Sequence, residues 1–293
     1  GLRLPECALN ENHMNHLSLS FICQALNLTA PTKDAEVKRI VTDSRDIRAG
    51  DVFVALAGEY FDAHDFVADV LDKGALAAIV AREDCAALSG SLKVDDTLVA
   101  LQQLASAWRL HINPFVFGIT GSSGKTTVKE MLAAILCHAF GAETVLATAG
   151  NFNNHIGLPL TLLNLKPQHR YAVIEMGMSH SGELAELTRI ARPDVALVNN
   201  ALRAHIGCGF DGVGDIAKAK SEIYQGLPEN GLAWLPAESN YLNIFQVACA
   251  DLNTQTFGAE QGDLHAENII LNPLSCCCEL IYKSERTVVN LPA

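Results

Sequence analysis

Short apolar segments alternate with segments of helical periodicity along the first third of the chain. Residues 52–56 and 77–81 are continuously apolar, which is typical of strands that are buried on both faces. Residues 65–73 predict a short helix between them, and we expect Asp65 to cap its N-terminus. This order of elements is typical of an α/β domain.

A longer amphipathic helix is predicted next, and it ends near residue 112. Asp95 and Asp96 are the candidate caps before it. Residues 111–114 (HINP) end the periodicity, because proline disfavours a helical residue before it. We therefore predict two domains, at 1–112 and 113–293. The apolar positions at helical spacing are Leu98, Leu101, Leu104, Ala105 and Trp108.

The second part of the chain continues the alternation of strands and helices. Residues 115–119, 171–174 and 195–198 are uninterrupted apolar segments, and residues 182–191 predict a helix between the last two. This alternation implies a largely parallel sheet that is covered by helices. The helix after the first of these strands should bury one apolar face, formed by Val128, Met131, Leu132, Ile135 and Leu136.

The last thirty residues change character. Residues 267–271, 277–282 and 287–291 predict an antiparallel hairpin or meander. In a strand, Cys276 and Cys278 would point to one face and the cysteine between them to the other, which indicates ordinary packing rather than a zinc site. The predicted fold class is α/β: a small N-terminal α/β domain, then a mostly parallel sheet with a terminal antiparallel extension.

Composition and charge narrow the classes of function. The 293 residues are 49% hydrophobic and 18% charged, as in a globular protein, and the net charge of −12 argues against a nucleic acid or an anionic membrane as partner. No apolar run approaches the length of a membrane span, which is about 20 residues. The N-terminus lacks the pattern of a signal peptide, so we expect a cytoplasmic protein with reduced cysteines. A cloning junction at His13-Met14 would make residues 1–13 non-native.

The segment with the clearest chemistry is residues 120–127 (TGSSGKTT), between a predicted strand and a predicted helix. This is the context of a P-loop, in which backbone N–H groups and the helix N-terminus bind nucleotide phosphates. Lys125 can reach the β- and γ-phosphates, and the Thr126 hydroxyl can bind Mg²⁺. The residues predicted to contact the nucleotide are Gly121, Ser122, Ser123, Gly124, Lys125, Thr126 and Thr127.

This segment departs from the strict P-loop pattern at one position. The pattern has a glycine where this chain has Ile119. The alternative to a P-loop is a Gly/Ser turn with an exposed lysine. Because the strand, the turn, the Lys-Thr pair and the helix all agree, we favour the P-loop.

Two further side chains are expected at the carboxyl edge of the predicted sheet. Glu175 ends one apolar strand, and His205 follows another by a few residues. Ligands of parallel sheets bind at this edge, so Glu175 could hold Mg²⁺ beside Thr126. Each residue also has an ordinary alternative, namely a solvated glutamate and a structural or exposed histidine.

Two other groups of polar residues have both an ordinary and a functional interpretation. Lys218 and Lys220 lie in a helix-like segment, where residues two apart diverge, so at most one would face a site. Asn151, Asn153 and Asn154 lie between glycines and suit a loop that binds a polar ligand such as a sugar diphosphate. Solvated lysines and asparagine-rich turns are the ordinary alternatives.

These segments occur together, in an order that resembles the Mur ligases of bacterial peptidoglycan synthesis. The resemblance covers essentially all of residues 14–293. It is strongest to the branch that joins D-alanyl-D-alanine to UDP-N-acetylmuramoyl-tripeptide. The segments that carry it are 42–45 (TDSR), 50–56 (GDVFVAL), 120–127, 150–159 (GNFNNHIGLP), 173–177 (VIEMG), the pairs 199–200 and 204–205, and 217–223 (AKAKSEI).

The resemblance implies a role for each candidate residue in the ATP site. Lys125 would act on the ATP phosphates, and Thr126 would bind Mg²⁺. Glu175 would ligate one magnesium ion and His205 a second. Lys220 resembles the family lysine that is carbamylated and becomes a metal ligand. The implied cofactors are therefore ATP and two Mg²⁺ ions, with Lys125, Lys220 and His205 as catalytic residues.

The resemblance also implies where the other substrates bind. Ser44 and Arg45 would lie beside the UDP moiety, and residues 1–112 would form the uridine-nucleotide domain. Asn153 and Asn154 would approach the nucleotide sugar. A third, C-terminal domain of the family helps to bind the amine, and we expect it to be absent from this chain.

The function implied is that of an ATP-dependent ligase. ATP would phosphorylate the terminal carboxylate of UDP-N-acetylmuramoyl-tripeptide, and the amine of D-alanyl-D-alanine would displace the phosphate. We expect a monomer that binds these small molecules, does not bind nucleic acid and does not insert into a membrane. The alternatives are another Mur or folylpolyglutamate-type ligase with a different amine, or a nucleotide-binding fragment without ligase activity.

Overall fold

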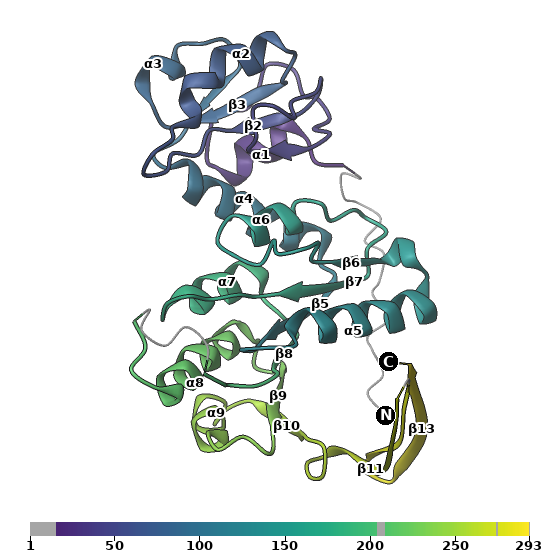
Figure 1. Ribbon diagram of the computed structural model, residues 1–293. Coiled ribbons are helices and arrows are strands. Elements are labelled where there is room, and N and C mark those ends of the chain that lie inside the picture. The colour runs from purple at the N-terminus through teal and green to yellow at the C-terminus, as the bar shows by residue number, and fades with distance from the viewer. Residues whose placement is uncertain (1–15, 204–208, 274, 293) are drawn as a thin grey trace. The chain divides into compact units, whose positions relative to one another are not determined.

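The computed structural model describes residues 16–203, 209–273 and 275–292 (Figure 1). The chain forms two compact units. The first comprises residues 1–115 and 135–172, and the second comprises residues 116–134 and 173–293. This division reflects internal contacts, and the domain boundary near 112 stays a prediction. Within the described ranges, no helix is both long and apolar enough to cross a bilayer.

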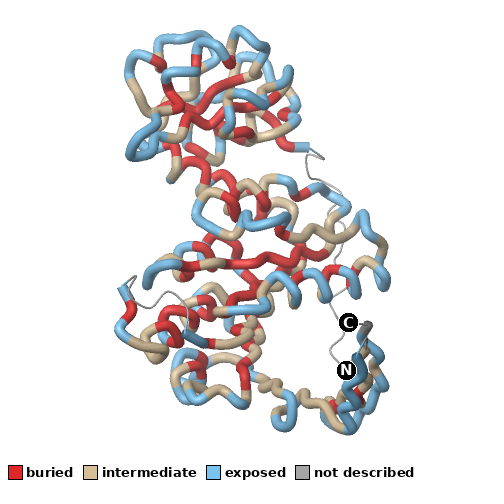
Figure 2. The backbone as a smooth tube through the Cα atoms, in the orientation of Figure 1, coloured by how far each residue is buried: buried red, intermediate tan, exposed pale blue. Residues whose placement is uncertain are grey.

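The first unit is built on a four-stranded parallel sheet. Its strands, in the order in which they pair, are β1 (Ile40–Val41), β2 (Val52–Val54), β3 (Ala77–Val80) and β4 (Ser91–Lys93). Its remaining elements are α1 (Leu19–Ala25), η1 (Ala63–Phe66), α2 (Val67–Asp72), α3 (Glu83–Ala86), α4 (Thr97–Ile112), η2 (Ala142–Thr144), β6 (Val145–Ala147) and α6 (Gly157–Leu162). Phe53 and Val80 pack with Val67 and Val70 in the buried core, in agreement with the predicted α/β arrangement (Figure 2).

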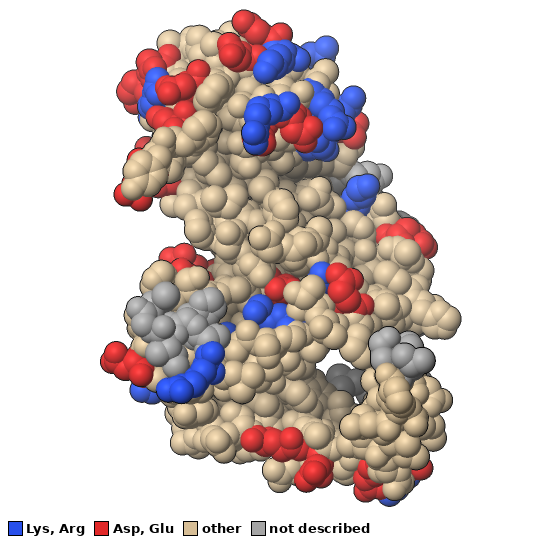
Figure 3. Space-filling view, in the orientation of Figure 1, with Lys and Arg blue, Asp and Glu red and all other residues tan. Residues whose placement is uncertain are grey.

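Ion pairs hold the loops around this sheet. Acidic and basic side chains are interspersed on the face shown in Figure 3. Arg39, next to β1, donates to Asp46 at 2.8 Å and to Asp51 at 2.5 Å. Because Asp51 is buried, its carboxylate needs this partner, and the pair fixes the entry into β2.

Helix α4 confirms the longest helix predicted for this part of the chain. It begins after Asp96, whose Oδ1 accepts from the N–H groups of Leu98 at 2.8 Å and Val99 at 3.0 Å. It ends at Asn113, which adopts a left-handed conformation. On its buried side, the indole N–H of Trp108 donates to the carbonyl of Leu165 at 2.9 Å.

The prediction that Asp65 caps the helix of residues 65–73 is wrong. A 3-10 turn, η1, precedes α2, and Asp62 is its cap. The Asp62 carboxylate accepts from the N–H of His64 at 2.9 Å and lies 2.6 Å from the imidazole Nδ1 of the same residue. Asp65 instead accepts from Arg82 at 2.6 Å. The cap is therefore Asp62, the aspartate that also binds the buried imidazole of His64.

The second unit is built on an extended sheet with the strand order β13-β12-β11-β10-β9-β8-β5-β7. Pairing is parallel from β10 to β5 and antiparallel between β11, β12 and β13. The strands are β5 (Phe115–Thr120), β7 (Tyr171–Glu175), β8 (Val195–Val198), β9 (Leu232–Pro236), β10 (Asn253–Phe257), β11 (Leu264–Asn272), β12 (Ser275–Tyr282) and β13 (Glu285–Pro292). The helices are α5 (Lys125–Phe140), α7 (Glu183–Ala191), α8 (Val213–Ser221), η3 (Glu222–Gly226) and α9 (Leu242–Ala248). The predicted parallel sheet with a terminal antiparallel extension is confirmed (Figure 1).

The apolar face predicted for α5 is partly wrong. Met131 is 44% exposed and Ile135 is 62% exposed, whereas Lys129, Ala133 and Leu136 are buried. Two overlapping faces of this helix have similar apolar content, so periodicity alone does not choose between them.

The capping contact of α4 predicts a measurable difference between neighbouring aspartates. Asp96→Ala should lower the free energy of unfolding of the first unit by about 1 kcal/mol, because two N–H groups lose their acceptor. Asp95→Ala is the matched control, since this exposed residue does not cap the helix. Urea denaturation followed by circular dichroism would measure both. Equal losses for the two variants would contradict the assignment.

Candidate active site

The phosphate loop connects β5 directly to α5. Ile119 is buried within β5, opposite Leu197 of β8, so the strand continues to Thr120 and the turn begins only at Gly121. The residue that replaces the first glycine of the strict P-loop pattern therefore belongs to the sheet core. Gly124 has φ of +73°, a conformation that other residues rarely adopt.

Lys125 lies at the start of α5, over the loop. Its ammonium donates to the carbonyl of Gly121 at 2.9 Å. The first-turn N–H groups of a helix have no acceptor within the helix and carry the positive end of its dipole. A lysine, the helix N-terminus and the loop together form a site for phosphate groups.

A buried carboxylate faces the first turn of the same helix. The Thr126 hydroxyl donates to Glu175 Oε2 at 2.9 Å, and Glu175 is only 2% exposed at the end of β7. Hydroxyl and carboxylate oxygens are the ligands that Mg²⁺ prefers, so this pair fits the predicted metal. Within the described residues, no three His, Cys, Asp or Glu side chains converge on one metal position. A complete ion site would need a further oxygen ligand.

Lys220 is a buried lysine on α8, only 2% exposed. Burial, and then the positive charge of Lys125, lowers the pKa of its ammonium to about 8. Lys218, two residues earlier, is 71% exposed and forms an ion pair with Asp215 at 3.6 Å. The expected divergence of the two lysines is thus observed, and Lys220 is the one that lies near the phosphate loop.

The predicted metal ligand His205 lies outside the described residues. Its role stays a prediction.

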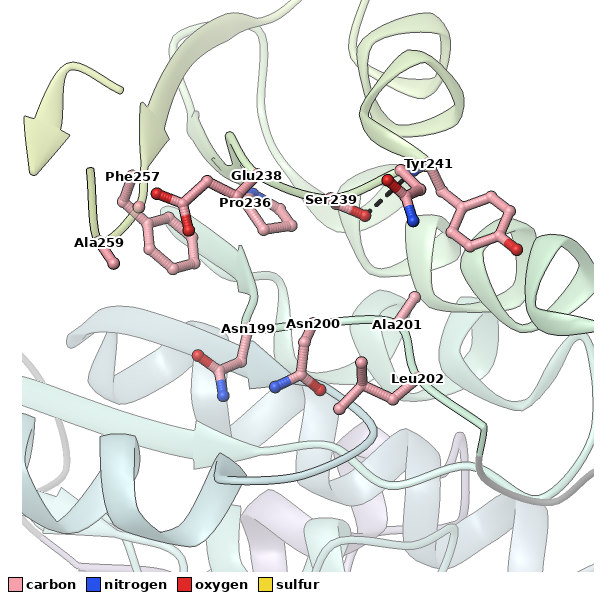
Figure 4. Close-up of a pocket in the computed structure, with 12 residues that line it drawn as sticks. Asn199, Asn200, Ala201, Leu202, Pro236, Glu238, Ser239, Tyr241, Phe257 and Ala259 are labelled. Atoms are coloured by element: carbon pink, nitrogen blue, oxygen red, sulfur yellow. Dashed lines mark hydrogen bonds between the residues drawn. The ribbon is translucent and has the colours of Figure 1, made fainter. Parts of the chain in front are cut away.

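A cavity of about 420 Å³ lies at the carboxyl ends of β8, β9 and β10. Asn199 and Asn200 line one side of it, opposite Phe257 and Glu238 (Figure 4). Tyr241 also lines it. The sequence analysis missed Glu238, Tyr241 and Phe257 because it did not assign residues 232–236 and 253–257 as strands of the parallel sheet. With those strands in place, their carboxyl ends would have pointed to this edge.

A second cavity, of about 440 Å³, lies in the first unit beyond the end of β1. Ser44 and Arg45, both predicted to lie beside the UDP moiety, line it with Asp43. The guanidinium of Arg45 binds the Asp43 carboxylate at 2.6 Å and 2.9 Å and lowers the pKa of that group to about 2. The rings of Phe61 and Phe66, which the sequence analysis missed, line the same cavity and stack with centroids 5.6 Å apart.

The asparagine-rich loop precedes α6 in the first unit. Asn154 Oδ1 accepts from the N–H groups of Ile156 at 3.1 Å and Gly157 at 2.8 Å. Asn153 donates its backbone N–H to the carbonyl of Asn151 at 2.7 Å. The carboxamide oxygen of Asn154 thus holds the loop, as the turn interpretation expected, and substrate contacts of Asn153 and Asn154 stay a prediction.

The loop between a buried strand and a helix, the Lys-Thr pair and the strand-end carboxylate define a P-loop type of nucleotide site. Comparison with known proteins is more specific. The family profile of the Mur ligase middle domain matches residues 119–293, and that of the Mur ligase family catalytic domain matches residues 36–109. The chain belongs to the Mur ligase family, which confirms the resemblance seen in the sequence.

Several members of the family are similar to this chain in sequence and in structure. The UDP-N-acetylmuramoyl-tripeptide–D-alanyl-D-alanine ligase of Haemophilus influenzae is 45% identical over 261 residues, which are 89% of this chain and 56% of that protein. A crystal structure of MurF from Acinetobacter baumannii superposes with a TM-score of 0.85 at 37% identity, over 95% of this chain and 62% of that one. The MurF ligase of Thermotoga maritima, solved with ADP, gives a TM-score of 0.77 at 33% identity, over 87% of this chain and 58% of that one. The chain thus spans little more than half the length of its curated relatives.

The lowered pKa of Lys220 can be measured directly. In metal-free protein and CO₂-free buffer, reductive ¹³C-methylation should give one lysine resonance that titrates near pH 8. Burial lowers the pKa because it disfavours the charged ammonium. Above pH 8 the amine is therefore neutral in the folded protein, while a lysine of the unfolded chain is still protonated. In this pH range the free energy of unfolding rises with pH. Lys220→Ala should remove this resonance and Lys218→Ala should not. A signal lost in the Lys218 variant instead would contradict the assignment.

Proposed function

We propose that this chain carries the nucleotide-binding and UDP-sugar-binding parts of an ATP-dependent ligase. The ligase joins D-alanyl-D-alanine to UDP-N-acetylmuramoyl-tripeptide in peptidoglycan synthesis. The observation that carries the proposal is the Thr126–Glu175 contact beside Lys125, in a chain 45% identical to a ligase of that name. We also propose that it acts in the cytoplasm.

ATP fits the phosphate loop and the neighbouring cavity. The N-terminus of α5 and Lys125 would bind the phosphates, and the ammonium would leave the Gly121 carbonyl to do so. The cavity lined by Asn240, Tyr241 and Phe257 lies beside the loop and offers aromatic and amide side chains for the nucleoside. The Thermotoga relative was solved with ADP, which supports binding of an adenine nucleotide by this chain.

The same site suits Mg²⁺. Thr126 and Glu175 would hold one ion, Lys220 would contribute as a carbamate, and His205 would contribute to a second ion. The neutral amine of Lys220 attacks CO₂, forms an N–C bond and loses a proton, which yields an anionic N-carboxylate. Burial favours the neutral amine that this reaction needs. When bound, Mg²⁺ would offset the negative charge of the ATP phosphates.

The chemistry proposed is carboxylate activation followed by aminolysis. The terminal carboxylate of the tripeptide attacks the γ-phosphorus of ATP, ADP leaves, and an acyl phosphate forms. The amine of D-alanyl-D-alanine then attacks the acyl carbon, inorganic phosphate leaves, and the nitrogen loses a proton. Lys125 would offset the charge of the transferring phosphoryl group, because an ammonium already placed on the phosphates by ATP binding needs little further reorganisation.

The UDP moiety would bind in the cavity of the first unit. Arg45 supplies a cation for the diphosphate, and Ser44 supplies a hydroxyl. The stacked rings of Phe61 and Phe66 offer an aromatic surface to the base. Asn153 and Asn154 would meet the sugar.

Loss of Lys125 should weaken ATP binding selectively. Lys125→Ala removes a charge-assisted contact worth about 1.5–3 kcal/mol, so the dissociation constant for ATP with Mg²⁺ should rise about 10- to 150-fold. Isothermal titration calorimetry would measure it, with exposed Lys218→Ala as the control. An unchanged affinity in the Lys125 variant, with the fold intact, would sink the P-loop assignment.

The second cavity predicts binding of the UDP-linked substrate without ATP. UDP-N-acetylmuramoyl-tripeptide should bind the wild-type chain, and Arg45→Ala should weaken it about tenfold through loss of a charged hydrogen bond. Arg48→Ala is the matched control, because Arg48 is exposed and pairs with Asp46 away from the cavity lining. Equal affinity in the wild type and the Arg45 variant would refute this placement.

A further inference from the structure

We infer that Asn199 and Asn200 form a template against which the phosphate loop folds, and that Asn200 is a positioning residue for nucleotide binding. This inference rests on the proposed ATP site. It adds a role for two residues that the sequence analysis noted only as part of the family resemblance.

Asn200 binds the loop through both ends of its carboxamide. Its Oδ1 accepts from the backbone N–H groups of Ser122 and Ser123, each at 3.0 Å. Its Nδ2 donates to the carbonyl of Ser123 at 3.2 Å and contacts the hydroxyl of the same residue at 3.3 Å. One side chain therefore satisfies two donors and one acceptor of the turn.

Asn199 explains why the loop needs its two glycines. Its Nδ2 donates to the carbonyl of Ser123 at 2.8 Å. A Cβ added at Gly121 would lie 2.9 Å from the Asn199 Cβ, and one added at Gly124 would lie 2.8 Å from the Asn199 Nδ2. Both distances are shorter than real Cβ contacts, so larger residues would push the loop off this side chain. The glycines and Asn199 are thus parts of one packing arrangement.

Strand pairing delivers the two asparagines to the loop. The N–H of Asn199 donates to the carbonyl of Thr120 at 2.8 Å, which extends the parallel ladder of β5 and β8 by one residue. Beyond this point, Leu202 donates its N–H to the Ser122 hydroxyl at 2.9 Å. The segment 199–202 therefore follows the loop along its length.

Alternatively, the Asn200 carboxamide could occupy the position of a phosphate oxygen and be displaced when ATP binds. The contacts favour a permanent template. The Nδ2 groups of both asparagines donate to the Ser123 carbonyl. A phosphate oxygen carries no proton at neutral pH, so it cannot donate to this carbonyl in their place. The N–H groups at the start of α5 stay available for the phosphates. Ser122 and Ser123 would then shape the site and leave direct phosphate contact to the residues that follow.

The test uses Asn200→Ala and Asn200→Asp, with Asn243→Ala, at an exposed position of α9, as the matched control. Calorimetry measures the affinity for ADP with Mg²⁺, and NMR hydrogen exchange follows the amides of Ser122 and Ser123. Asn200→Ala should weaken ADP about tenfold or more and speed exchange of the Ser123 amide about tenfold or more, because that N–H loses its acceptor. The Ser122 amide should change less, because it also donates to the backbone carbonyl of residue 200 at 3.1 Å. Asn200→Asp loses the donor, places a negative charge beside the phosphates, and should weaken ADP further. Asn243→Ala should change neither quantity.

Tighter ADP binding in Asn200→Ala would overturn the inference, because it would show that the carboxamide competes with phosphate. Unchanged affinity and exchange would overturn it as well. If the variants do not fold, the wild type still decides: the two amides should stay equally protected with and without ADP, and deprotection on binding would contradict a template. If the wild type binds no nucleotide, the proposed function fails, while the exchange measured in free protein still tests the template.

Discussion

Parallel pairing of β5 with β8 is the constraint on which the phosphate site depends. The pairing aligns Thr120 with Val198, so both strands end at the same edge and release their loops side by side. One of these loops is the phosphate loop and the other carries Asn199 and Asn200. Because the register of a parallel pair is held by evenly spaced hydrogen bonds, a shift of one residue would separate the asparagines from the glycines they contact.

Two buried charged groups give this edge its chemical character. Glu175 and Lys220 are each 2% exposed, and burial of charge is costly unless it is paired or neutralised. Glu175 accepts from Thr126, whereas Lys220 responds by a pKa lowered to about 8. Groups whose pKa is shifted by burial and a specific charged neighbour concentrate at functional sites. A carbamate would convert the unfavourable cation beside Lys125 into an anion that a metal can use.

Much of this arrangement could be predicted from the sequence. Uninterrupted apolar segments gave the parallel strands, the Gly-Ser-Ser-Gly turn gave the loop, and spacing on a helix separated Lys218 from Lys220. These features depend on local periodicity and on chemistry carried by adjacent residues.

Other features required tertiary information. Helix α5 buries Lys129 and exposes Met131, and the spacing of its apolar residues does not predict this rotation. The choice of Asp62 over Asp65 as a cap depends on the buried imidazole of His64. The residues of the cavity at the carboxyl ends of β8, β9 and β10 come from strands distant in sequence, so only the assembled sheet brings Phe257 to Asn199.

A crystal structure of the chain with a non-hydrolysable ATP analogue and Mg²⁺ tests the central claim most directly. The account predicts phosphates at the N-terminus of α5, with the Lys125 ammonium moved from the Gly121 carbonyl to the γ-phosphate. It also predicts Mg²⁺ on the oxygens of Thr126 and Glu175. A nucleotide bound elsewhere, or one bound here with Lys125 still on Gly121 and no ion at Glu175, would contradict it.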